Sequence, residues 1–194
     1  DKDIVWTSPN TFVASSNCVL YCNAKIDFVD IDPTTFNICV NSLKKKLIES
    51  AKEGNLPKIL ILVHLTGRPC ELDKIKELSK KYKFKIIEDA SHAIGAKYKN
   101  IPIGSCHWSD FTIFSFHPVK IITCGEGGML TTNSKKLYKL ACMYRTHGIT
   151  KNEEDFIFKK KGSWHYEQQL LGFNYRMTDI HAALGSSQLK RLDT

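Results

Sequence analysis

The chain has 194 residues, 42% of them apolar, and a formal net charge of +8 from 28 Lys and Arg against 20 Asp and Glu. This length suits one well-packed domain of a soluble protein. No apolar run approaches the roughly 18 residues of a membrane span, and no arginine-rich run with interleaved aromatic residues indicates nucleic-acid binding. We interpret the lysine excess mainly as solvated surface, with some capacity to attract an anionic ligand such as a nucleotide.

Seven cysteines are scattered along the chain without a CxxC pair. Cys18 and Cys22 lie one helical turn apart, but no second pair accompanies them. We therefore expect neither a disulfide framework nor a zinc site, and reduced thiols in the cytoplasm fit this pattern best.

Strands and helices are expected to alternate along the first half of the chain. The expected strands are 4–7, 25–31, 59–63 and 84–87, and the expected helices follow Ser8-Pro9 and span 42–53 and 71–83. Ser8 and Asn41 are the expected N-caps of the first two helices, and Gly54 is expected to end the second. The alternation predicts an α/β domain with a mostly parallel central sheet and helices on both faces.

The second half is expected to hold two more strands, a long loop and two helices. Strands are expected at 110–116 and 128–132, and helices at 134–144 and 177–192, the last capped by Thr178. The polar stretch 151–169 has no clear period and is expected to be a long loop or lid-like excursion. The chain reads as the central piece of a longer protein.

Lys120 lies in the turn between these two strands, within the sequence FSFHPVKIITCGEGG. An amine held in a pocket at a strand end loses part of its hydration, which makes it a better nucleophile toward a carbonyl. This suggests Schiff-base chemistry with pyridoxal phosphate, although an isolated lysine after a strand is more often a solvated surface charge.

Asp89 ends an expected strand, where ligands collect in open parallel sheets. It either caps a short helix over 90–94 or pairs with a pyridine nitrogen, which keeps that nitrogen protonated. His92 either contacts the ring oxygen of the cofactor or is a structural histidine. Ser115 either donates to a phosphate or is an ordinary strand-end serine, and Phe12 either lies on the ring or belongs to the core.

Four sequence blocks, in this order, resemble the DegT/DnrJ/EryC1/StrS family of pyridoxal-phosphate-dependent sugar aminotransferases. They are EDASHAIG (88–95), FSFHPVKIITCGEGGM (114–129), RTHGI (145–149) and GFNYRMTDIHAALGSSQL (172–189). The resemblance implies that residues 1–194 are the cofactor-binding large domain of the type I aminotransferase fold. The family's N-terminal phosphate-binding segment and C-terminal small domain have no counterpart in these residues.

The resemblance also implies a role for each site residue. Lys120 forms the Schiff base with the cofactor and then moves the proton, and Asp89 pairs with the pyridinium nitrogen. His92 stands near the ring hydroxyl, where many members of the family have Gln.

Four further residues receive roles in the same way. Ser115 binds the cofactor phosphate, and Phe12 takes the position that stacks on the ring. Either Asn174 or Arg176 reaches the phosphate of the neighbouring subunit's cofactor, because the family forms homodimers with a shared site.

The implied reaction transfers an amino group from glutamate to the C4 keto group of a nucleotide-activated 6-deoxy sugar. HPVKIIT and EDASHA are most similar to family members that aminate UDP-linked sugars in pseudaminic acid biosynthesis. A non-catalytic regulator that binds pyridoxal phosphate and a sugar dehydratase of the same fold are the alternatives, and Lys120 argues against both. A plain nucleotide-binding domain would need a glycine loop after the first strand, where the sequence has Ser8-Pro9-Asn10.

Overall fold

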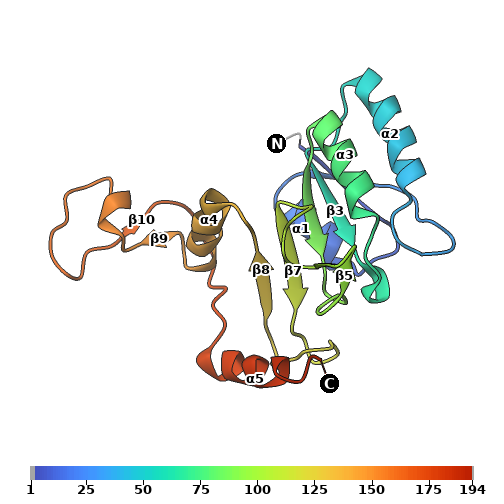
Figure 1. Cartoon of the computed structure of the whole chain (residues 1–194). Helices are drawn as coiled ribbons and strands as arrows, with labels where there is room; N and C mark the ends of the chain where they lie inside the picture. Colours follow the sequence, from blue (N-terminus) through green and yellow to red (C-terminus); the bar gives the residue numbers. More distant parts are fainter. Residues whose placement is uncertain (1–2, 194) are drawn as a thin grey trace.

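The computed structural model describes residues 3–193, which contain a six-stranded sheet with strand order β2-β1-β3-β4-β7-β8 (Figure 1). The first five of these strands are parallel, and β8 pairs antiparallel with β7. This arrangement confirms the predicted α/β class with a mostly parallel central sheet. The strands of this sheet are β1 (Ile4–Thr7), β2 (Lys25–Phe28), β3 (Ile59–Val63), β4 (Lys85–Asp89), β7 (Phe111–Ser115) and β8 (Gly128–Thr131).

Helices cover both faces of the sheet. Figure 1 shows α2 and α3 side by side on one face, where Leu43 and Leu72 join Leu60 in the main core. On the other face, Val19 of α1 packs with Val5 in a smaller core. The helices are α1 (Ala14–Tyr21), α2 (Val40–Glu53), α3 (Leu72–Tyr82), α4 (Lys135–Arg145) and α5 (Asp179–Leu189). Within residues 3–193, none of these helices combines the length and the apolar character needed to cross a bilayer.

Two predicted helix caps are wrong. The helix α1 starts at Ala14, well after Ser8, which is buried with 2% of its surface exposed. The helix α2 starts at Val40, so Asn41 lies inside its first turn. The Cys39 N–H donates to the carbonyl of Asp30 (2.9 Å), which holds the preceding chain against the end of β2 and determines where the helix begins. Gly54 ends α2 in the left-handed conformation, as predicted.

The expected loop 151–169 is confirmed as an excursion, but its base is structured. Figure 1 shows it projecting from α4 away from the sheet. The short strands β9 (Ile149–Thr150) and β10 (Glu167–Gln168) pair at its base. The short helix η2 (Glu153–Asp155) lies between them in the sequence. Three more short elements complete the chain: η1 (Leu65–Gly67), β5 (Lys97–Tyr98) and β6 (Ile101–Pro102).

A buried carboxylate near the carboxyl end of β4 links this strand to the residue after β3 and to the start of β7. Glu88 accepts hydrogen bonds from Ser109 and Thr112, and its other oxygen lies 2.8 Å from His64 Nε2. The Cys70 N–H donates to His64 Nδ1 (3.2 Å), so Nε2 carries the ring proton and donates to Glu88. Burial raises the pKa of Glu88, but these hydrogen bonds outweigh it and hold the pKa below its usual value.

We predict that Glu88→Gln destabilises the fold by about 1–3 kcal/mol at neutral pH, because the amide leaves buried donors unpaired. A carboxylate whose pKa is lower in the folded protein stabilises the fold at pH values above its unfolded-state pKa of about 4.3. This stabilisation is lost as the pH falls through the folded-state pKa. Urea unfolding between about pH 7 and pH 3 should therefore show a shallower acid loss in Glu88→Gln than in wild type. The exposed Glu71→Gln is the control, and an identical acid slope in all three proteins would contradict this account.

Candidate functional site

A cavity of about 720 Å³ opens at the carboxyl ends of β3, β4 and β7. Its volume lies within the range of about 300–1,000 Å³ that is usual for small-molecule sites. Five of the seven predicted site residues line it: Phe12, Asp89, His92, Ser115 and Lys120. The sheet therefore brings together residues from two of the four sequence blocks and Phe12 from the segment before α1.

Asp89 is the last residue of β4 and is half-buried. Its Oδ2 accepts a hydrogen bond from Ser15 Oγ (2.8 Å), and its Oδ1 accepts from both the N–H (3.1 Å) and the hydroxyl (2.6 Å) of Ser91. The helix considered at 90–94 is absent from the structure, so Asp89 caps a turn instead. Both carboxylate oxygens are thus fixed by hydrogen bonds.

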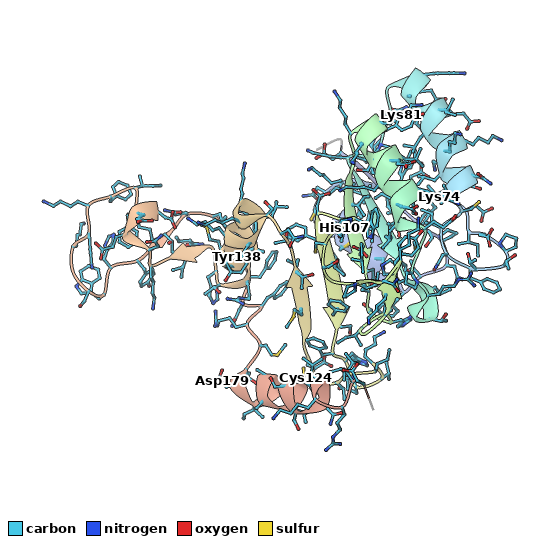
Figure 2. All side chains as sticks on the ribbon, in the orientation of Figure 1. Lys74, Lys81, His107, Cys124, Tyr138 and Asp179 are labelled. Carbon is cyan, nitrogen blue, oxygen red and sulfur yellow. The ribbon has the colours of Figure 1, made fainter. Side chains whose placement is uncertain are left out.

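Lys120 is half-buried in the turn that follows β7. Its N–H donates to the carbonyl of His117 (2.9 Å), and the loop closes where the Cys124 N–H donates to the carbonyl of Phe116 (3.0 Å). Figure 2 shows Cys124 next to α5, and a Cβ built on Gly185 would lie 3.3 Å from that of Cys124. The helix α5 therefore supports the lysine turn from outside the sheet.

The other three residues of the cavity lie around these two groups. Phe12 precedes α1 and is 76% exposed, so its assignment to the core is wrong. Ser115 is half-buried at the end of β7, where its hydroxyl accepts the N–H of His117 (3.4 Å). His92 is exposed beside the cavity.

Asn174 and Arg176 lie outside this cavity. Arg176 lines a second cavity that shares Glu126 and Gly127 with the first. Asn174 lines neither of these two cavities, and its backbone forms a β-bridge with Thr146. Within one chain, the fold does not bring these two residues to Lys120.

Sequence reasoning missed Thr11, Ser15 and Ser91, which also line the cavity. Ser15 is buried, with 5% of its surface exposed, and its hydroxyl donates to Asp89. Ser15 lies one turn before the buried Val19, and a buried hydroxyl needs a partner. That spacing was the available signal.

Cys18 is another nucleophile at the cavity wall. Burial raises the pKa of its thiol, and the neighbouring Cys22 and Asp89 act in the same direction. A thiol with a raised pKa remains protonated near neutral pH and is a poor nucleophile. Cys18 is therefore a poor candidate for the nucleophile of this cavity.

The fold and the cavity together define an α/β domain of the aminotransferase type, with an amine and a carboxylate at the carboxyl edge of a parallel sheet. The DegT/DnrJ/EryC1/StrS aminotransferase family matches residues 1–194, and the chain belongs to this family. This confirms the family inferred from the four sequence blocks.

Similar proteins are about twice as long as this chain. A UDP-4-amino-4,6-dideoxy-N-acetyl-beta-L-altrosamine transaminase of Campylobacter jejuni is 40% identical over 192 residues, which are 99% of this chain and 47% of that protein. A putative pyridoxal phosphate-dependent aminotransferase of Bacillus subtilis is 35% identical over 100% of this chain and 46% of its own length. The chain spans about half the length of the curated relatives it matches.

A solved aminotransferase structure has the same fold as this chain. Helicobacter pylori PseC, an aminotransferase involved in the biosynthesis of pseudoaminic acid, matches with a TM-score of 0.86 at 30% identity. The match covers 100% of this chain and 47% of that one. It confirms the predicted aminotransferase fold.

Gly67 allows the loop after β3 to pass close to His92. It has a φ of +87°, and a Cβ there would lie 2.7 Å from the His92 carbonyl oxygen. Gly54 has a similar φ of +72° but open space around it. We predict that Gly54→Ala costs about 1 kcal/mol from backbone strain alone, and that Gly67→Ala costs about 3 kcal/mol because the clash adds to the strain. Urea denaturation of both variants measures the difference, and equal losses would contradict the close approach.

Proposed function

We propose that this chain is the cofactor-binding part of a pyridoxal-phosphate-dependent aminotransferase that acts on a nucleotide-activated 4-keto-6-deoxy sugar. The observation that carries the proposal is that Lys120 and Asp89 line the same cavity. Family membership and the named activity of the Campylobacter jejuni relative support the substrate class. Glutamate is the proposed amino donor, and the cytoplasm is the proposed compartment.

The residues of the cavity fit pyridoxal phosphate. When bound, this cofactor supplies an aldehyde that condenses with amines and a protonated ring that withdraws electrons. The Asp89 carboxylate suits a protonated ring nitrogen, and the Ser115 hydroxyl suits a phosphate oxygen. Apolar side chains such as Ile87 and Ile113 form part of the wall, which suits a flat ring.

Each side chain of the cavity has its own role in the proposed reaction. The Lys120 amine would hold the cofactor until the amino donor displaces it. The free Lys120 amine would then move the α-proton of the donor to the cofactor, and in the second half-reaction it would move a proton from the cofactor to C4 of the sugar. Asp89 would keep the ring nitrogen protonated, Phe12 would cover one face of the ring, and His92 would contact the ring hydroxyl.

The proposed active unit is a homodimer with shared sites. Asn174 and Arg176 lie outside the Lys120 cavity of their own chain, which is compatible with contact to the cofactor phosphate of a neighbouring subunit. An arginine guanidinium and an asparagine amide both donate hydrogen bonds that a phosphate accepts.

We predict that Lys120→Ala, made in the full-length protein that carries these residues, reduces sugar amination below detection. Lys120→Arg should do the same, because it keeps the charge but loses the nucleophile. The exposed Lys97→Ala is the matched control and should keep normal turnover. Chromatography of the nucleotide-sugar product measures the rate, and turnover by Lys120→Ala at the control rate would disprove the assignment.

We predict that Asp89→Asn slows the reaction by orders of magnitude, because a neutral amide does not stabilise a protonated ring nitrogen. Single-turnover reaction with glutamate alone, followed by cofactor absorbance, isolates the first half-reaction. A rate close to that of wild type would remove Asp89 from this role.

A further inference from the structure

A chain of hydroxyl groups leads to the Asp89 carboxylate from the α1 side of the sheet. Thr11 Oγ1 lies 3.0 Å from Ser15 Oγ, and Ser15 Oγ lies 2.8 Å from Asp89 Oδ2. All three residues line the cavity, and Ser15 is 5% exposed. Neither the family roles nor the sequence pattern had assigned Thr11 or Ser15 to the site.

The direction of these hydrogen bonds follows from counting protons. An ionised carboxylate only accepts, so Ser15 uses its single hydroxyl proton on Asp89. Its oxygen is then the acceptor for the Thr11 hydroxyl, which gives the order Thr11 to Ser15 to Asp89. Hydrogen bonds that point the same way along a chain polarise and strengthen one another.

The Ser15 bond also completes the anchoring of the carboxylate. The N–H and hydroxyl of Ser91 hold Oδ1, and they belong to the same turn as Asp89. Ser15 holds Oδ2 from α1, a separate element that also lines the cavity. Without it, Oδ2 would accept no hydrogen bond among these contacts, and the carboxylate would be held through Oδ1 alone.

We propose that Ser15, oriented by Thr11, is a positioning residue that fixes the Asp89 carboxylate through its Oδ2 atom. In this role it keeps the pyridine nitrogen of the cofactor protonated. The inference rests on the proposed function, since it concerns the same carboxylate. The chemistry is specific to a hydroxyl at residue 15, so threonine replaces serine there and alanine does not.

Ser16 provides a matched control on the same helix. Its hydroxyl donates to the carbonyl of Val13 (2.9 Å) and makes no contact with Asp89. Ser16→Ala removes the same atom as Ser15→Ala from the adjacent position. The comparison separates loss of a helix hydroxyl from loss of the hydroxyl that holds Asp89.

The test uses the full-length holoenzyme loaded with pyridoxal phosphate labelled with nitrogen-15 in the ring. The nitrogen-15 chemical shift reports protonation of that nitrogen directly, and a pH titration locates its midpoint. We expect Ser15→Ala to lower this midpoint by about one pH unit and to reduce kcat about tenfold with a smaller change in KM. Ser15→Thr and Ser16→Ala should match wild type.

The possible outcomes distinguish failure of the proposed function from failure of the positioning role of Ser15. A wild-type protein that binds no cofactor overturns the proposed function and this inference with it. A loaded wild type with an unchanged midpoint in Ser15→Ala overturns the positioning role alone. If Ser15→Ala does not bind the cofactor, the near-isosteric Thr11→Val is the test, because it leaves Ser15 in place. A smaller decrease of the titration midpoint in Thr11→Val supports the positioning role, and an unchanged midpoint overturns it.

Discussion

Backbone hydrogen bonds at the carboxyl ends of β3, β4 and β7 hold the candidate site in place. The His64 N–H donates to the Asp89 carbonyl (3.1 Å), and the Ala90 N–H donates to the Ile113 carbonyl (2.8 Å). Val63, Asp89 and Ile113 therefore lie side by side at the edge where parallel sheets collect their functional side chains, and β7 continues two residues further, to Ser115. Lys120 lines the cavity at this edge, in the turn that follows β7. The site thus depends on the pairing of strands that are distant in sequence.

Two adjacent acids at the end of β4 have separate tasks because neighbouring residues of a strand point to opposite faces. Glu88 is buried and accepts hydrogen bonds from His64, Ser109 and Thr112. Its carboxylate therefore connects β4 to the chain after β3 and to the start of β7. Asp89 lines the cavity, and its charge is available to a ligand. One carboxylate stabilises the edge of the sheet that presents the other.

Much of the fold and part of the site could be predicted from the sequence. The apolar run Ile59–Val63 indicated a strand buried on both faces, and the sequence blocks around Asp89 and Lys120 indicated residues that the structure places in one cavity. The start of α2 could not be predicted, because it depends on a backbone bond to Asp30, outside the helix. The contact between Ser15 and Asp89 was equally hidden, because it depends on how α1 is rotated against a strand far along the chain.

The central claim is that Lys120 is the amine that binds the cofactor. Borohydride reduction of the full-length protein with pyridoxal phosphate, followed by peptide mapping with mass spectrometry, tests this claim most directly. We expect a pyridoxyl adduct on the peptide that contains Lys120, and on no other lysine in comparable yield. A folded protein with no adduct, or with its adduct on another lysine, would contradict the account.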